Sequence, residues 1–179
     1  LDSINTDVEV PEIDNAMVEA VLQSVPSPLE ISFLIKETGS AYDKNYLNST
    51  SNVSKYNSGY EKAINLGIYG ADLGYTNIFE KSQDGIFYLD AVTDLADQLN
   101  IGQFFEYSVI KDLIKHNDNM DSLLMITTSN FEKINNYLQN QNRSQLSAML
   151  LYGGWLEGVN LLCRVHDNAP NAEIKERIG

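Results

Sequence analysis

The sequence predicts an all-α fold, a compact bundle of about seven or eight helices. Apolar residues recur at three- and four-residue spacing through most of the 179 residues, which is the pattern of amphipathic helices. No segment alternates apolar and polar residues as a half-buried strand does. The Asp84-Gly85 pair is a typical hairpin signal, but it lies at an expected helix start. With 43% hydrophobic residues, the chain can bury an ordinary core.

The chain divides into a short leader and one helical domain. Residues 1–10 are polar and acidic and carry no helical stripe, so we expect an extended leader or tether there. Residues 11–179 have a length that suits a single domain. A last helix is expected from about Ala172, and the sequence ends within its first turns, so we expect the domain to be truncated at its C-terminus.

Two helices are expected before residue 40. Pro11 suits an early helical position, and Pro26 ends the first pattern. Ser27 can cap the second helix with Pro28 at its first position, and Gly39 is a typical stop. The apolar positions of the first helix are Ile13, Met17, Val18, Val21, Leu22 and Val25, and those of the second are Ile31, Leu34 and Ile35.

The middle of the chain predicts two long helices. Residues 41–47 allow a short helix and the polar residues after them start as a loop, before a long helix from about Lys55 to Lys81. Ser82 or Asp84 can cap the next helix. Its apolar row extends from residue 86 to residue 99, and Asn100 with Gly102 ends it.

Three further helices are expected after residue 103. Residues 104–115 carry two adjoining apolar rows at four-residue spacing. A turn follows, with Asp118 or Asn119 available as a cap, and residues 121–141 form the next helix. Arg143 or Ser144 opens the last long helix, which is expected to reach about Val165.

One pattern occurs twice in the chain. The stretch "IYGADLGYTNIF" at residues 68–79 and the stretch "LYGGWLEGVNLL" at residues 151–162 share Tyr-Gly, a small residue, a Leu and an Asn at the same spacing. Each copy lies within a glycine-rich helix, and each interior glycine costs about 1 kcal/mol relative to alanine. Close approach of a neighbouring backbone compensates such a cost, so the pattern predicts two helices that cross closely, related by a pseudo-two-fold axis in a duplicated helical hairpin.

The repeated pattern also has a functional interpretation. A glycine groove can admit a small ligand between aromatic walls, with a few polar groups to orient it. The candidate ligand-binding residues are Tyr69, Asp72, Tyr75, Tyr152, Trp155 and Glu157. The alternative is helix packing with no ligand at all, and the sequence leaves both interpretations open.

Charge and composition exclude some partners. The formal net charge is −13, with 25 acidic and 12 basic residues. No basic stripe is present to displace phosphate counterions, so a nucleic-acid partner is not expected. The acidity gives solubility and is also compatible with a cationic ligand or partner. No uninterrupted run of eighteen apolar residues occurs, so we expect no transmembrane segment.

Candidate catalytic chemistry is sparse. Cys163 and His166 are three residues apart and could meet on one helical face as a nucleophile and its base. No oxyanion hole or orienting third group accompanies them, so a buried structural cysteine is the competing interpretation. One cysteine and two histidines do not make a closed zinc site, and calcium-loop and nucleotide-binding motifs are absent. We therefore expect no enzyme activity, no metal site and no cofactor.

Residues 60–101, "YEKAINLGIYGADLGYTNIFEKSQDGIFYLDAVTDLADQLNI", resemble exported bacterial proteins of uncharacterised function, many of them lipoproteins. The Asn-, Tyr- and Asp-rich texture and the acidic leader are similar as well. The resemblance implies a location in the bacterial periplasm or outer envelope, with the leader as a tether to a lipid anchor outside this sequence. It carries no motif of known chemistry and therefore no site residue.

Three functional hypotheses follow. The first is a non-enzymatic helical binding or sensing module of the bacterial cell envelope, with an unknown small molecule or protein as its ligand. The second is a structural or protein-interaction domain in which the glycines serve packing alone. The third, a hydrolase-type enzyme using Cys163 and His166, has the least support in the sequence.

Overall fold

The structure, a computed structural model, describes residues 28–37, 39–116 and 120–168. Within these residues it contains α-helices and short 3₁₀-helices and no strand, which confirms the all-α fold class. The predictions for the leader, the helix at residues 11–25, the cap at Asp118 or Asn119 and the helix after Ala172 lie outside the described residues. The elements are α2 (Pro28–Glu37), η1 (Lys44–Tyr46), η2 (Thr50–Lys55), α3 (Gly59–Ile78), α4 (Ser82–Gln98), η3 (Gly102–Phe104), α5 (Tyr107–His116), α6 (Met120–Asn140) and α7 (Ser144–Asn168).

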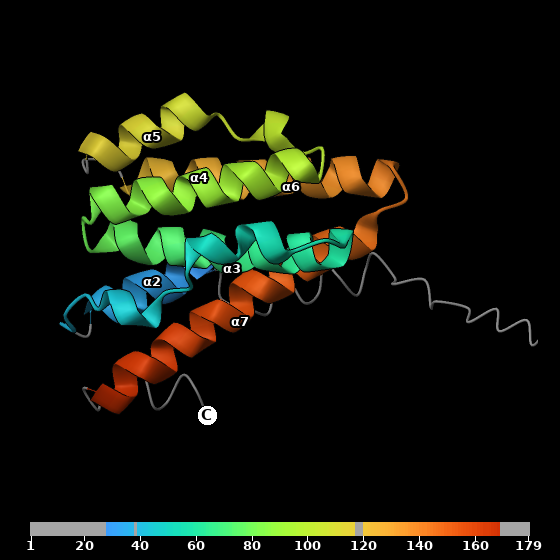
Figure 1. Ribbon diagram of the computed structural model, residues 1–179. Coiled ribbons are helices and arrows are strands. Elements are labelled where there is room, and N and C mark those ends of the chain that lie inside the picture. Colours follow the sequence, from blue (N-terminus) through green and yellow to red (C-terminus); the bar gives the residue numbers. More distant parts are fainter. Residues whose placement is uncertain (1–27, 38, 117–119, 169–179) are drawn as a thin grey trace, which may run out of the picture.

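Helix α3 is the centre of the bundle (Figure 1). It packs against α4 on one side and against α7 and α2 on another, and α4 in turn packs against α5. Helix α7 crosses α3 obliquely, and its first turns lie against α6. The α3–α7 crossing therefore joins the two helices that carry the repeated pattern.

The long central helix begins later than the sequence predicts. Residues 50–55 form the 3₁₀-helix η2, and α3 starts at Gly59 rather than near Lys55. Ser58 and Glu61 form a reciprocal capping box, in which each side chain accepts a hydrogen bond from the other residue's backbone N–H. The sequence pattern does not mark this start, because the box lies in a polar stretch with no apolar row beside it.

Helix α4 is not capped by Asp84 or Ser82. The helix starts at Ser82 itself, after Lys81, and Asp84 lies in its first turn. The Asp84 carboxylate accepts hydrogen bonds from the Tyr42 hydroxyl, at 2.8 Å, and from the Lys44 ammonium. Burial opposes ionisation of Asp84, but the Lys44 and Tyr42 hydrogen bonds outweigh it and lower the pKa of the carboxyl. Asp84 therefore ties the segment around η1 to α4.

Helix α5 also starts later than expected, at Tyr107 rather than near residue 104. Residues 102–104 form η3, and Phe105 has extended backbone with φ −101° and ψ 103°. The end of α4 follows the prediction, because Asn100 adopts a left-handed conformation with φ 60°. The last helix continues three residues beyond the predicted Val165, to Asn168.

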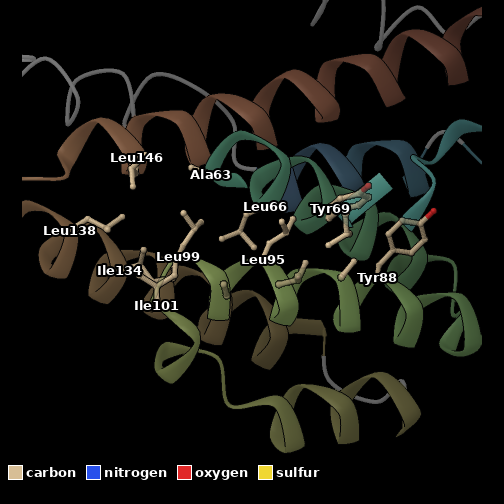
Figure 2. Close-up of a cluster of buried hydrophobic side chains, with 14 residues drawn as sticks. Ala63, Leu66, Tyr69, Tyr88, Leu95, Leu99, Ile101, Ile134, Leu138 and Leu146 are labelled. Atoms are coloured by element: carbon tan, nitrogen blue, oxygen red, sulfur yellow. The ribbon is translucent and has the colours of Figure 1, made fainter. Parts of the chain in front are cut away.

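The main core lies between α3, α4, α6 and the start of α7 (Figure 2). Leu66 of α3, Leu95 of α4 and Leu138 of α6 are among its almost fully buried members. Tyr69 and Tyr88 lie together at one end of this cluster, with ring centroids 6.3 Å apart. A second buried cluster joins α2, the end of α3 and the end of α7, and contains Ile31, Ile35, Tyr75, Ile78, Leu161, Leu162 and Val165.

Two glycines permit the close α3–α7 crossing. A Cβ atom on Gly67 would overlap the backbone of Leu150, and one on Gly153 would overlap the backbone carbonyl of Ile64. Close helix approach at the glycines is therefore what the structure shows. Internal duplication is not confirmed, because Gly70, the counterpart of Gly153 in the first copy, is exposed with open space around its Cβ position.

Candidate functional site

The α3–α7 crossing buries two carboxyl groups next to each other. Asp72, one turn beyond the glycine contact on α3, has no exposed surface, and Glu157 of α7 is 6% exposed. The two side chains are close enough for Glu157 to raise the pKa of Asp72 through charge and hydrogen bonding. Neither carboxyl forms a salt bridge within the described residues. Both belong to the predicted set of ligand-binding residues, and the structure brings them together.

Asn48 lies over the carboxyl pair. Its backbone N–H and its side-chain amide both donate to Asp72 Oδ2, each at 3.2 Å. Its side-chain amide is also close enough to Glu157 to favour the ionised form of that carboxyl and so to lower its pKa. Asp72 Oδ1 is fully buried and accepts no hydrogen bond from an amide or hydroxyl group of the described residues. An unsatisfied buried carboxyl oxygen is costly and calls for a functional or structural explanation.

Two tyrosine hydroxyls hold the loop that presents Asn48. Tyr88 of α4 donates to the Asn48 carbonyl at 2.8 Å, and Tyr69 of α3 donates to the Ser49 carbonyl at 2.9 Å. The Tyr56 hydroxyl lies 3.2 Å from that of Tyr69. Burial raises the pKa of both Tyr69 and Tyr88, and the nearby Asp72 adds to the effect. Both phenols therefore remain neutral donors, and the loop is fixed over the carboxyl pair from two helices.

The two carboxyls differ in what surrounds them. Burial, followed by the charge of Glu157, raises the pKa of Asp72 well above its usual value. Burial also raises the pKa of Glu157, but Asn160 and Arg164 oppose that change. Asn160 Nδ2 donates to Glu157 Oε1 at 3.0 Å, and Arg164 Nε donates to Asn160 Oδ1 at 3.1 Å. We therefore assign the shared proton of the pair to Asp72 and the negative charge to Glu157.

Tyr75 belongs to a different part of the molecule. It is fully buried in the cluster of α2, α3 and α7, where its ring lies 5.4 Å from that of Tyr42 and 4.9 Å from that of Phe79. Its hydroxyl accepts a hydrogen bond from the Asp43 backbone N–H at 3.2 Å. The described contacts give Tyr75 a role in packing, away from the carboxyl pair.

Tyr152 and Trp155 lie on the other side of α7. They precede Glu157 by five and two residues, so a helical period of 100° per residue directs them away from its face. Tyr152 is 51% exposed and Trp155 is half-buried, with ring centroids 6.2 Å apart. The four expected aromatic walls therefore do not enclose one common space around Asp72.

The candidate catalytic pair gains no further partner in the described residues. Cys163 is half-buried on α7, and the nearest acidic group to His166 is its neighbour Asp167, at 4.0 Å from Nδ1. Asp167 is exposed, so it does not orient the imidazole as a buried third group would. Among the described residues, no three or more acidic, His or Cys side chains are placed together so that they could hold a metal ion.

Helix α7 is the described helix whose length and composition come near those of a membrane span. Residues 144–167 are long and apolar enough, on those two properties alone, to cross a membrane, although no uninterrupted apolar run occurs. In the structure 44% of the most apolar part of this helix is buried against other helices. A core helix meets the same criterion, and α7 carries the buried Glu157 at its crossing with α3.

Asn48 and Tyr88 are site residues that the sequence did not single out. Asn48 is the first residue of a polar stretch whose composition is typical of a loop. Tyr88 is one more large residue among the apolar positions of α4. Asn48 lies in a loop, so no apolar periodicity could identify it as a partner of Asp72, which is 24 residues away in the sequence. The only available signal was Asp72 itself, an acidic residue inside an otherwise apolar and glycine-rich helix segment, which requires a buried partner.

Comparison of the chain with protein-family models, with curated proteins and with solved structures found no match.

Proposed function

We propose that this protein is a non-enzymatic helical binding or sensing module of the bacterial cell envelope, and that the Asp72–Glu157 pair is its responsive site. The observation that carries the proposal is the fully buried Asp72 carboxyl, which faces a second carboxyl and has one oxygen that no amide or hydroxyl group contacts as a donor. When two adjacent carboxyls are removed from water, binding a cation between them is far more favourable than ionising both of them without one.

The proton is the cation that the site favours. Asp72 has no exposed surface, and a proton needs no additional volume between the helices. Two carboxyls with the Asn48 amide supply few ligands for a hard metal ion, which takes six or more oxygens. The groups facing the pair are Asn48 from the loop, Tyr69 from α3, Tyr88 from α4, and Asn160 and Arg164 from α7. A module at the envelope is exposed to the external pH, so proton sensing fits the location that the sequence resemblance implies.

The direction of the response follows from the pKa of the pair. Both carboxyls have pKa values above those of the unfolded chain, about 3.9 for Asp and 4.3 for Glu. Their contribution to stability is therefore fully present below the unfolded pKa values and is lost as the pH rises through the folded ones. Ionisation of both groups would place two like charges inside the α3–α7 crossing and loosen it.

The test is the thermal stability of the full chain between about pH 4 and pH 9, alone and with a panel of metal ions, ammonium compounds and small molecules. We expect the wild type to lose stability at rising pH relative to the double variant Asp72→Asn/Glu157→Gln. Asp94→Asn is the matched control, since it removes an exposed carboxyl of α4. A ligand at one hundred times its dissociation constant would add about 2.7 kcal/mol, a shift of several degrees.

Each outcome decides between the possibilities. A pH-dependent difference without any other ligand makes the proton the sensed species. A shift by one metal or amine that the double variant abolishes makes the site a binding site for that cation. Equal pH profiles for wild type and double variant, together with no ligand shift, would refute the proposal.

A protein-interaction domain is the second candidate function. The outward side of α7 supports it, because Tyr152 and Leu156 are 51% and 41% exposed beside the half-buried Trp155. Exposed aromatic residues are typical of interaction surfaces. Binding of a partner that Trp155→Ala abolishes and the Asp72→Asn/Glu157→Gln variant retains would favour this candidate.

A further inference from the structure

The segment that lies over the carboxyl pair is attached to the bundle at its two ends. We call residues 43–52, between Tyr42 and Val53, the strap. None of its residues is buried. Val53 belongs to the main core, and the Tyr42 ring stacks on Tyr75 at the second buried cluster. Packing therefore anchors both ends of the strap, and the residues between them lie at the surface of the bundle.

Hydrogen bonds hold the middle of the strap on the helices. Asn48 donates twice to Asp72 Oδ2, and its carbonyl accepts a hydrogen bond from Tyr88. The next carbonyl, that of Ser49, accepts a hydrogen bond from Tyr69. The backbone hydrogen bonds that the strap forms outside its 3₁₀-helices join residues three apart, so they stay within the strap itself. Each contact with the helices can be exchanged for a hydrogen bond to water when the strap lifts.

The strap and the helix crossing can both respond to a change of charge in the pair. We propose, on the basis of the function proposed above, that the strap lifts when Asp72 loses its proton, while α3 and α7 remain in contact. With both carboxyls ionised, a closed strap would keep two like charges away from water, which is costly. A lifted strap admits water to both of them.

The helix crossing resists separation more than the strap does. Gly67 and Gly153 lie against the backbones of α7 and α3, and both buried clusters contain side chains from these two helices. Separation of the helices would expose fully buried apolar side chains, whereas lifting the strap moves residues that are already exposed or half-buried. The strap is therefore the first element to move.

The contacts of Asn48 are too few to hold the strap closed over an ionised Asp72. Both hydrogen bonds go to Oδ2, and at 3.2 Å they are at the long end of the usual range. Oδ1 accepts no hydrogen bond from an amide or hydroxyl group of the described residues. Water beneath a lifted strap can donate to both oxygens and to Glu157, so hydration of the two charges favours the open form.

The groups around the pair leave Asp72 as the one that titrates. Arg164 of α7 donates to Asn160, which donates to Glu157, and both favour the ionised form of that carboxyl. Tyr69 of α3 and Tyr88 of α4 are neutral donors, because burial raises the pKa of both phenols. The charged side chains of α2, the strap, η2 and the start of α4 are exposed or half-buried, and water screens them: Lys36, Glu37, Asp43, Lys44, Lys55 and Asp84.

Amide hydrogen exchange of the full chain, followed residue by residue between about pH 5 and pH 9, tests this motion. Protection factors are compared, because they remove the pH dependence of the intrinsic exchange rate. The reporter is the Asn48 N–H, which the closed strap holds on Asp72. Lifting the strap releases one proton, so this protection factor should fall by up to about tenfold per pH unit below the pKa of the closed pair. Protection of the amides at Gly67 and Gly153 should stay constant.

Three variants separate the strap from other causes. Asp72→Asn/Glu157→Gln removes the titrating pair and should abolish the pH dependence of strap protection. Tyr88→Phe removes one hydrogen bond to the strap, so it should lower strap protection severalfold at every pH and leave the pH dependence in place. Tyr107→Phe is the matched control, because its hydroxyl bonds to Asp90, and it should leave the strap unchanged.

The outcomes distinguish the strap from the proposed function. Equal losses of protection in the strap and at the two glycines would show that the bundle opens as a whole, which overturns the strap motion and leaves the pH response intact. Strap protection that is constant with pH, in a wild type whose stability is not, would overturn it as well. Strap protection that still depends on pH in the double variant would assign the motion to another group. Identical pH profiles of stability in wild type and double variant would refute the proposed function and the strap motion together.

Discussion

The two copies of the repeated pattern occupy opposite environments. In the first copy Tyr69 is fully buried and donates a hydrogen bond to Ser49, while in the second copy Tyr152 is 51% exposed. For the glycines that follow these tyrosines, the burial is reversed. Gly70 faces open space, and Gly153 lies against the Ile64 carbonyl. Residues of the same type at the same spacing therefore have different surroundings in the two crossing helices.

The difference shows that neighbouring elements determine which face of each helix is buried. Helix α3 is enclosed by α4, α7 and the loop at Asn48, so its tyrosine side is interior. Helix α7 uses the side of Gly153 and Glu157 to meet α3, and its tyrosine side is turned outward. Paired substitutions at matching positions of the two copies test this interpretation directly.

The largest contrast is expected at the two tyrosines. Tyr69→Ala removes a fully buried ring and the hydrogen bond that holds the Ser49 carbonyl, so we expect a loss of about 4 kcal/mol in the free energy of unfolding. Tyr152→Ala removes an exposed ring and should cost less than about 1 kcal/mol. Chemical denaturation of both variants measures the difference, and similar losses at the two positions would contradict the asymmetry.

The glycine pair should give effects of opposite sign. Gly153→Ala forces a methyl group into the backbone of α3, and we expect a loss of about 3 kcal/mol, because neither backbone can move without separating the helices. Gly70→Ala adds a methyl group in open space on a helix and should raise stability by about 1 kcal/mol through helix propensity. Thermal unfolding of the two variants is sufficient, and a stable Gly153→Ala protein would show that the crossing is looser than described.

The two carboxyls should differ in their share of the pH response. Asp72 is the more buried and has no nearby positive group that favours its ionised form, so Asp72→Asn should remove more of the pH dependence than Glu157→Gln. Each pKa unit of the raised value corresponds to about 1.4 kcal/mol of stability lost after ionisation. Asp72→Asn is therefore expected to be more stable than the wild type at alkaline pH. Urea unfolding at several pH values measures this, and a larger effect of Glu157→Gln would reverse our assignment of the proton.

The smallest contrast concerns the asparagines that close the two patterns. Asn160 donates to Glu157 and favours its ionised form, so Asn160→Ala should raise the pKa of that carboxyl further. Asn77 is buried in α3 with a side-chain amide nitrogen that has no hydrogen-bond partner, and Asn77→Ala should leave the Glu157 titration unchanged. Carboxyl carbon chemical shifts recorded against pH report the two titrations, and equal shifts would exclude a specific role for Asn160.

Much of this fold could be predicted from residue patterns. Apolar periodicity gave the helices of the described chain to within a few residues, and the cost of interior glycine indicated a close crossing at Gly67 and Gly153. Asp72 and Glu157 were predicted as the charged groups of one site, and they lie together. Spacing along a helix says which residues share a face, and it does not say which face meets a neighbour.

The parts that could not be predicted depend on contacts between distant segments. The Asn48 loop reaches Asp72 through hydrogen bonds across 24 residues, and Tyr88 supports that loop across 40. The opposite burial of Tyr69 and Tyr152 depends on which helices enclose α3 and α7, which no local pattern encodes. The capping box at Ser58 was visible as Ser-x-x-Glu, but no apolar row beside it distinguished it from loop.

The glycine contact also limits how the chain can change in length. Asp72 follows Gly67 by five residues and Glu157 follows Gly153 by four. Because both glycines lie at the helix crossing, these two spacings determine whether the carboxyls face each other. One residue inserted after either glycine would rotate the corresponding carboxyl by about 100° around its helix axis while the contact itself remained. Insertions and deletions within these two short intervals should therefore separate the carboxyls. They should also turn Tyr75 and Ile78 of α3, or Leu161 and Val165 of α7, out of the second buried cluster. The loop between α6 and α7 carries no such constraint on its length.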